Sequence, residues 1–285
     1  MVIFILLLPI TFFFAAFIVN AAMFRPERRP EENIDGRRVT FPDGRNRLEG
    51  YLWNEAGTRG LLVFAHGMGT GVEYYLPEIR HFATQGYKVF AFEYSGYAGS
   101  TGHFYGFPQA VFDLKSAIEF INDGSLPLIL LGHSMGGYAV CAVLQCLSCP
   151  VSTIVAYAPF YSSGEAIAEM TCRMPKWGRL LRLLILPVQY VLFGTRHRIN
   201  GVNGLRSANI PALILQGSCD DEVSCTGCSM YAHRGELAGS AVTFRLVEDE
   251  DSSGHMTVIR KKGTHCLNAD TMQIVDSFLD EIENN

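Results

Sequence analysis

Residues 128–137, Leu-Ile-Leu-Leu-Gly-His-Ser-Met-Gly-Gly, constrain the fold of this chain more than any other stretch. The four leading apolar residues are typical of a strand buried on both faces, and the small apolar residues 138–147 predict a helix after it. Ser134 then lies at a strand-to-helix corner, with Gly132 and Gly136 in the G-x-S-x-G spacing where a β-carbon has no room. We expect this corner to present the serine hydroxyl as a nucleophile.

Strand patterns alternate with helical patterns along the rest of the chain, which predicts an α/β fold with a mostly parallel sheet and right-handed crossovers. A turn signal at residues 42–44 indicates an N-terminal hairpin. Further strands are predicted at 61–65, 88–94, 152–158, 211–216 and 242–247, and helices at 74–85, 110–121, 230–237 and 269–282. Ligands of such sheets bind at the carboxyl ends of the strands.

A serine nucleophile needs a base in hydrogen-bond reach, and the base needs a carboxylate to orient it. Asp220 follows the strand at 211–216 and is the predicted acid. The neighbouring Asp221 remains an alternative, because the register of a loop is not fixed by sequence, and Glu222 is expected to be a solvated loop charge.

His255 is the predicted base, because it follows the last strand and is preceded by Gly254. The residues 256–259 alternate in a β-like manner and could extend a hairpin. Such a hairpin would carry His265 back to the same edge of the sheet, so His265 stays open as the alternative base.

An oxyanion requires two preorganised amide donors. The N–H group of Met135, directly after the serine, is the first candidate. The segment His66-Gly67-Met68-Gly69 follows a strand end and can turn its amides inward, so the N–H group of Met68 is the second.

These motifs resemble the α/β-hydrolase family, in the branch of monoacylglycerol lipases and serine aminopeptidase-like enzymes. Residues 132–137 resemble its nucleophile elbow, His66-Gly67 its oxyanion motif, and residues 93–102 its D-Y-R-G-x-G-x-S-x-G loop. This loop departs from the pattern at Glu93, Ser95 and Ala98. The resemblance covers roughly residues 38–282 and implies neither a metal nor an organic cofactor. We expect His66, Gly67 and Tyr97, in the two motif loops, to contact the substrate.

The first 24 residues contain no charged side chain, and about 20 apolar residues suffice to cross a bilayer. Five arginines follow within residues 25–38, so the positive-inside rule predicts a single-pass anchor with the catalytic domain on the cytoplasmic side. A cleaved signal peptide is the alternative, but it would have a basic start, and Val19-Asn20-Ala21 is only a passable cleavage site. Residues 25–37 are expected to form a linker, and residues 38–285 the hydrolase domain.

A basic and strongly apolar helical insertion is predicted at about residues 160–207, where this fold often carries its cap. Such a segment can lie on an anionic membrane surface, or its apolar face can simply pack on the domain. Together with the N-terminal segment, it favours a membrane partner and a lipid or other acyl ester as substrate.

The net charge of −5 gives no support to nucleic-acid binding, and no obligate protein partner is evident. Eight cysteines are expected to be reduced thiols, although two C-x-x-C pairs have the spacing of zinc ligands. The predicted activity is that of a membrane-anchored serine hydrolase that cleaves carboxylic esters through an acyl-enzyme. A serine peptidase or an acyl-thioesterase is the alternative within the same mechanism, and a non-catalytic binding protein is the alternative outside it.

Overall fold

The computed structural model of the chain describes residues 2–26 and 34–284, with side chains from residue 11 onward. Its strands are β1 (Arg37–Asp43), β2 (Asn46–Trp53), β3 (Leu61–Ala65), β4 (Lys88–Glu93), β5 (Leu128–His133), β6 (Thr153–Tyr157), β7 (Ala212–Gly217) and β8 (Val242–Val247). They form one sheet in the order β1-β2-β4-β3-β5-β6-β7-β8. β2 is antiparallel to β1 and β4, and all other neighbours are parallel. The predicted α/β sheet is confirmed.

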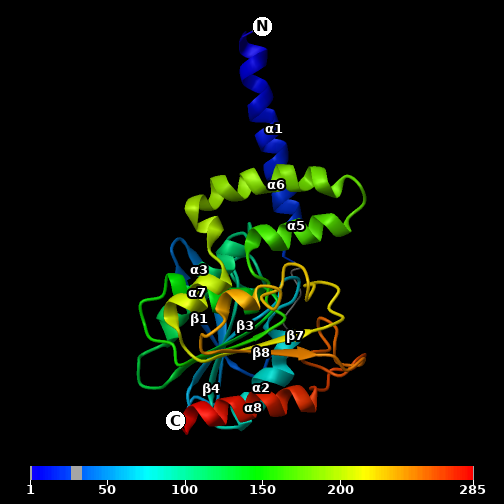
Figure 1. Cartoon of the computed structure of the whole chain (residues 1–285). Coiled ribbons are helices and arrows are strands. Elements are labelled where there is room, and N and C mark those ends of the chain that lie inside the picture. Colours follow the sequence, from blue (N-terminus) through cyan, green and yellow to red (C-terminus); the bar gives the residue numbers. More distant parts are fainter. Residues whose placement is uncertain (1, 27–33, 285) are drawn as a thin grey trace.

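The sheet is covered by helices on both faces, because its strands are apolar on both sides. In β3, Leu62 and Phe64 join one hydrophobic cluster, while Leu61 and Val63 join the other. The first cluster is closed by α2 (Leu76–Thr84) and α8 (Ala269–Glu283), and the second by α3 (Phe107–Ile121), α4 (Met135–Ala142) and α7 (Gly201–Ala208). Figure 1 shows α2 and α8 together on the side of the sheet away from α3 and α7.

A cap follows β6, as the sequence predicts, and consists of α5 (Ser163–Arg173) and α6 (Gly178–Phe193). The two helices form a separate layer beyond α3 and α7 (Figure 1). The predicted insertion extends too far, however, because α7 packs against α4 in the main domain. A β-carbon on Gly204 of α7 would lie 2.0 Å from the carbonyl oxygen of Cys141.

The N-terminal helix α1 (Val2–Met23) projects beyond the cap, but its last turns belong to the folded domain (Figure 1). Ala16, Asn20 and Phe24 are buried. The amide of Asn20 donates to the carbonyl of Tyr105 at 2.9 Å and accepts from Gln189 of α6 at 2.7 Å. The segment predicted as an anchor therefore ends inside the domain. Residues 27–33, most of the predicted linker, lie outside the described residues, and β1 begins at Arg37.

One helical stretch among the described residues, Gly178–Arg198, is long and apolar enough to cross a membrane by length and composition. The apolar stretch counted in α1, Thr11–Met23, is shorter than such a span. The predicted transmembrane helix at the N-terminus is therefore not established by the fold.

The helix predicted over residues 230–237 is wrong. The structure has turns there and only a short 3₁₀ helix, Arg234–Leu237. Gly235 weakens helix propensity, and the start of the segment is held elsewhere: the N–H of Met230 donates to the carbonyl of Pro159 at 2.8 Å. A tertiary contact therefore overrides the local pattern.

Candidate active site

The turn between β5 and α4 exposes Ser134 in a strained conformation, with φ of 55° and ψ of −114°. Its N–H group donates to the carbonyl of Tyr157 at 2.9 Å, which fixes the corner to the neighbouring strand. The two flanking glycines are required by close approach. A β-carbon on Gly136 would lie 1.9 Å from the carbonyl oxygen of Ala65, and one on Gly132 would lie 2.5 Å from the backbone of Gly136. The predicted turn is thus observed, and its strain persists because packing enforces it.

Asp220 and His255 meet although 35 residues separate them, since both follow the carboxyl ends of adjacent strands, β7 and β8. The Nδ1 atom of His255 lies 2.8 Å from Oδ2 of Asp220, and both side chains are buried. The other carboxylate oxygen of Asp220 accepts the N–H groups of Glu222 and Val223 at 2.9 and 2.7 Å. The carboxylate is thus oriented from both sides, whereas Asp221 is exposed.

The pKa of His255 is raised above its usual value. Burial alone would lower this pKa, but the hydrogen bond and the charge of Asp220 outweigh burial, and the carboxylate of Glu222 adds to them. Oε2 of Glu222 lies 3.7 Å from Nε2 of His255, on the ring edge opposite Asp220. Glu222 was expected to be a solvated loop charge. It is 69% exposed, yet it also reaches the imidazole.

A cavity of about 440 Å³ brings Ser134, His255, Gly67, Met68 and Met135 to one place. The predicted nucleophile, base and both amide donors therefore line the same space. A volume of this size is typical of a small-molecule site.

The alternative base, His265, lines a neighbouring cavity of about 360 Å³ together with Tyr97. The hairpin that would have carried it to Ser134 does not form. Residues 254–260 make helical turns, with the N–H of Arg260 donating to the carbonyl of Met256 at 3.0 Å. A single bridge then pairs Arg260 with Leu267, which leaves His265 on an exposed loop.

His133 joins three loops of the site, which the sequence did not indicate. Its Nε2 lies 3.2 Å from the carbonyl oxygen of His255, and its Nδ1 lies 2.7 Å from the hydroxyl of Tyr75. A carbonyl can only accept, so Nε2 carries the proton and Nδ1 accepts from the tyrosine. The Tyr75 oxygen in turn accepts the N–H of Gly67 at 3.3 Å. Burial lowers the pKa of His133 well below its usual value, so the ring is neutral.

Of the three predicted substrate contacts, only Gly67 lines the cavity that holds Ser134. A β-carbon on Gly67 would lie 3.6 Å from Cβ of Ser134, so the loop passes close to the serine. His66 is fully buried, with its Nε2 3.3 Å from a carboxylate oxygen of Glu93 and its ring 5.2 Å from that of Tyr97. His66 and Tyr97 therefore pack against each other behind the loop at residues 66–69 and do not line this cavity.

The cap closes one wall of the cavity through Ala166, Met170, Arg173 and Met174. It is fastened by α5, whose Glu169 accepts the backbone N–H groups of Ser224 and Cys228 at 3.0 and 2.6 Å. No sequence motif marks these residues, since the contact depends on how the cap folds back.

Among the described residues, no group of three or more His, Cys, Asp or Glu side chains is arranged to hold a metal ion. The two C-x-x-C pairs thus do not meet, and all eight cysteines are free.

Comparison with known proteins agrees with the observed fold. The family described as serine aminopeptidase, S33 matches residues 56–202. The monoacylglycerol lipase of Mycolicibacterium smegmatis is 28% identical over 131 residues, which cover 44% of this chain and 47% of the lipase. The alignment thus spans about half the length of that relative.

Solved structures show the same fold. An esterase of Pyrococcus furiosus superimposes with a TM-score of 0.66 at 19% identity, over 90% of this chain and 96% of the esterase. A bacterial membrane phospholipase A superimposes with a TM-score of 0.60 at 16% identity, over 98% of this chain and 93% of the phospholipase. Since the family match covers just over half of the sequence and the fold agrees, the chain belongs to the serine aminopeptidase S33 family of α/β-hydrolase serine hydrolases.

Proposed function

We propose that the protein is a membrane-bound carboxylic ester hydrolase whose triad consists of Ser134, His255 and Asp220. The observation that carries the proposal is the 2.8 Å contact between His255 and Asp220 at the cavity that Ser134 also lines. A buried acid–base pair beside a strained, glycine-flanked serine is the arrangement that acyl transfer to a hydroxyl needs.

In the proposed mechanism, Nε2 of His255 removes the hydroxyl proton as Ser134 Oγ attacks the ester carbonyl. The N–H groups of Met68 and Met135 stabilise the oxyanion. The tetrahedral intermediate then collapses and breaks the bond between the carbonyl carbon and the alkoxy oxygen of the ester. His255 returns its proton to the departing alcohol. Water then attacks the acyl-enzyme in the same way and releases the acid. Asp220 holds the imidazole and stabilises its charged form throughout.

An acyl ester is the favoured substrate because the cavity walls are largely apolar, with Phe107, Phe160 and Val223 among them. The names of the relatives, monoacylglycerol lipase and esterase, agree with this substrate class.

Membrane attachment is proposed for the face that carries α1 and α6. On α6 the exposed apolar side chains recur at helical spacing, with Leu180 59%, Leu183 67% and Val191 62% exposed. On α1, Phe12 and Phe14 are 59% and 65% exposed. We propose that α1 enters the bilayer while α6 lies along its surface.

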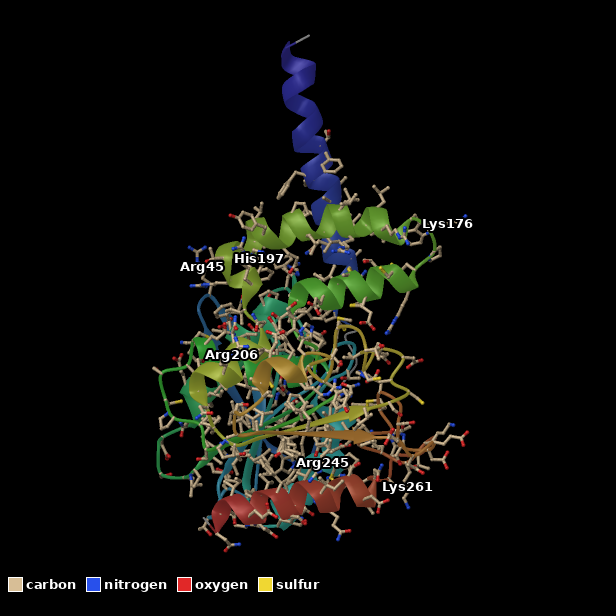
Figure 2. All side chains as sticks on the ribbon, viewed as in Figure 1. Arg45, Lys176, His197, Arg206, Arg245 and Lys261 are labelled. Atoms are coloured by element: carbon tan, nitrogen blue, oxygen red, sulfur yellow. The ribbon has the colours of Figure 1, made fainter. Side chains whose placement is uncertain are left out.

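Basic side chains frame this surface. Figure 2 shows Lys176 at the loop before α6 and His197 just beyond its other end, and Arg196 and Arg198 flank His197 in the sequence. Basic side chains at the two ends of α6 can attract the anionic headgroups of a membrane surface. The burial of Asn20 and Phe24 supports retention of the segment over its removal as a signal peptide, since cleavage at residues 19–21 would break the contact of Asn20 with Gln189.

The test is a Ser134→Ala variant, prepared as the full chain in detergent. We expect loss of labelling by a fluorophosphonate probe and a fall in ester turnover of at least about a thousandfold, because only oxyanion-hole catalysis would remain. Ser277→Ala is the matched control, since Ser277 is exposed on α8 across the sheet. Retained labelling of the Ser134→Ala protein would overturn the proposal.

A substrate panel separates the related activities. Ester, thioester and aminoacyl-anilide compounds are offered to the same preparation. Preference for the anilides would favour a peptidase, and preference for thioesters an acyl-thioesterase. No labelling by the probe, together with no turnover of any compound, would favour a binding protein.

A further inference from the structure

The cavity at Ser134 is lined by an unusual set of side chains. Five of the nine methionines of the chain are among its lining residues: Met68, Met135, Met170, Met174 and Met256. No leucine or isoleucine is among the described lining residues, although these are abundant in both hydrophobic clusters beside it. The sulfur-rich lining is therefore specific to this cavity.

The methionines come from four separate parts of the fold. Met68 follows β3, Met135 begins α4, Met256 follows the base, and Met170 and Met174 belong to the cap helix α5 and its C-terminal cap. Met135 is fully buried, while the other four are half-buried and border open space in the cavity. Flexible methionine side chains thus line the cavity both on the side of the main domain and on the side of the cap.

Methionine is unbranched, has three rotatable bonds and carries a polarisable sulfur, so it fills irregular spaces and repacks around ligands of different shape. Branched leucine or isoleucine walls hold one shape. Proteins that bind many partners use methionine-rich surfaces for this reason. A cavity walled by methionine should therefore distinguish acyl chains by shape much less than a wall of branched side chains would.

We infer that this cavity is an adaptable acyl-chain site, which accepts straight and bent chains alike, and that Met170 and Met174 of the cap set this tolerance. The inference rests on the proposed ester hydrolase function and adds the class of substrate: esters of both straight and cis-unsaturated acyl chains. The two cap methionines are specificity-determining residues and take no part in the chemistry.

The test compares oleoyl and stearoyl esters of one alcohol in mixed micelles, because the two chains have equal length and differ by a cis bend. We expect the full-length protein to show similar kcat/KM for both. In Met170→Leu/Met174→Leu, the ratio of oleoyl to stearoyl kcat/KM should change by at least about fivefold, in favour of whichever chain fits the stiffer wall. An apolar pocket of fixed shape separates ligands that differ by one methylene about 10- to 200-fold, so a difference in chain bend should be felt there.

The exchange of methionine for leucine nearly conserves volume, so the fold is expected to tolerate it. Met272→Leu is the matched control, because Met272 is buried in α8 in the hydrophobic cluster on the opposite face of the sheet. Met174→Leu alone, at the C-terminal cap of α5, gives the same test if the double variant does not fold.

The inference is overturned if the ratio in the cap variants equals that of the control, or if the unaltered protein already prefers one chain strongly. Neither result affects the proposed function, which requires only that esters be cleaved. An unaltered protein that cleaves no ester at all would count against the proposed function itself.

Discussion

At the residue scale, the site depends on short contacts that tune one imidazole. Asp220 and Glu222 approach opposite edges of the His255 ring, and both raise its pKa against the effect of burial. Because the proposed general base, His255, must be neutral to accept the serine proton, the rate should fall as the pH drops through this pKa. Glu222 is therefore expected to set part of the pH dependence although it is mostly exposed.

We expect Glu222→Gln to move the acid limb of the kcat/KM profile to lower pH, because the variant removes a negative charge 3.7 Å from Nε2. The shift should shrink at high salt, as expected for an exposed charge. The profile is measured with a soluble short-chain ester at two ionic strengths. Asp221→Asn is the control and should shift the limb less, since the effect of Asp221 on the imidazole is the smaller one. An unchanged limb in Glu222→Gln would exclude this role.

At the element scale, helix α5 is fastened to the main domain by two carboxylates one turn apart. Glu169 accepts two backbone N–H groups of the loop at residues 224–228. Glu165 lies 2.9 Å from Nε2 of His233, whose Nδ1 lies 2.9 Å from Glu236. The His233 ring also stacks on Tyr161 at a centroid distance of 3.9 Å. The position of the cap thus depends partly on the charge of one histidine.

The pKa of His233 is raised: burial alone would lower it, but the hydrogen bonds to Glu236 and Glu165 outweigh burial. Protonated His233 therefore stabilises the folded state fully at a pH below the pKa of this histidine in the unfolded chain, which is about 6.5. The stabilisation is lost as the pH rises through the higher pKa that His233 has in the folded protein. We expect His233→Gln to cost on the order of 0.5 kcal/mol of unfolding free energy at pH 5.5 and less at pH 8.5, a small value because the site is partly exposed.

Denaturant unfolding of both proteins at the two pH values measures this difference. His103→Gln, which replaces an exposed histidine in the loop before α3, should show no such pH dependence. A cost that is equal at both pH values would mean that His233 acts through packing on Tyr161 alone.

At the scale of the whole molecule, α1 has two parts with different neighbours. The start of α1 projects beyond the cap (Figure 1). Phe12 and Phe14 of this helix are exposed, while Ala16, Asn20 and Phe24 are buried. Phe24 contacts the ring of Phe107 edge-on at 5.1 Å. The proposed membrane attachment and the stability of the domain can therefore be tested separately by two truncations of different length.

Removal of residues 1–14 should lower activity on vesicle-borne esters at least about tenfold and affect activity on a soluble short-chain ester far less, because it removes the exposed Phe12 and Phe14 of the proposed membrane contact. Removal of residues 1–24 should lower both activities, because it also exposes the surface that Phe24 covers and leaves Gln189 without Asn20. Equal losses on both substrates in the shorter truncation would contradict the proposed attachment.

The sequence alone was sufficient to predict the strands of a mostly parallel sheet, the corner at Ser134 and the order of the site loops along the chain, because these features depend on local patterns. A run of buried apolar residues, flanking glycines and a strand–helix alternation are each visible within a few neighbouring residues. Residues 230–237 show the limit of this approach, since their helical pattern is overridden by a contact between Met230 and Pro159.

Only the tertiary structure decided which residues of distant segments are in contact. It paired His255, not His265, with Asp220, because the loop after residue 254 turns helically and does not form a hairpin. It also placed Asn20 beside Gln189 and gathered five methionines around one cavity. Such contacts depend on how whole layers of helices and strands pack against one another. The residues that meet are far apart in the sequence, so no local sequence pattern predicts that they will be in contact.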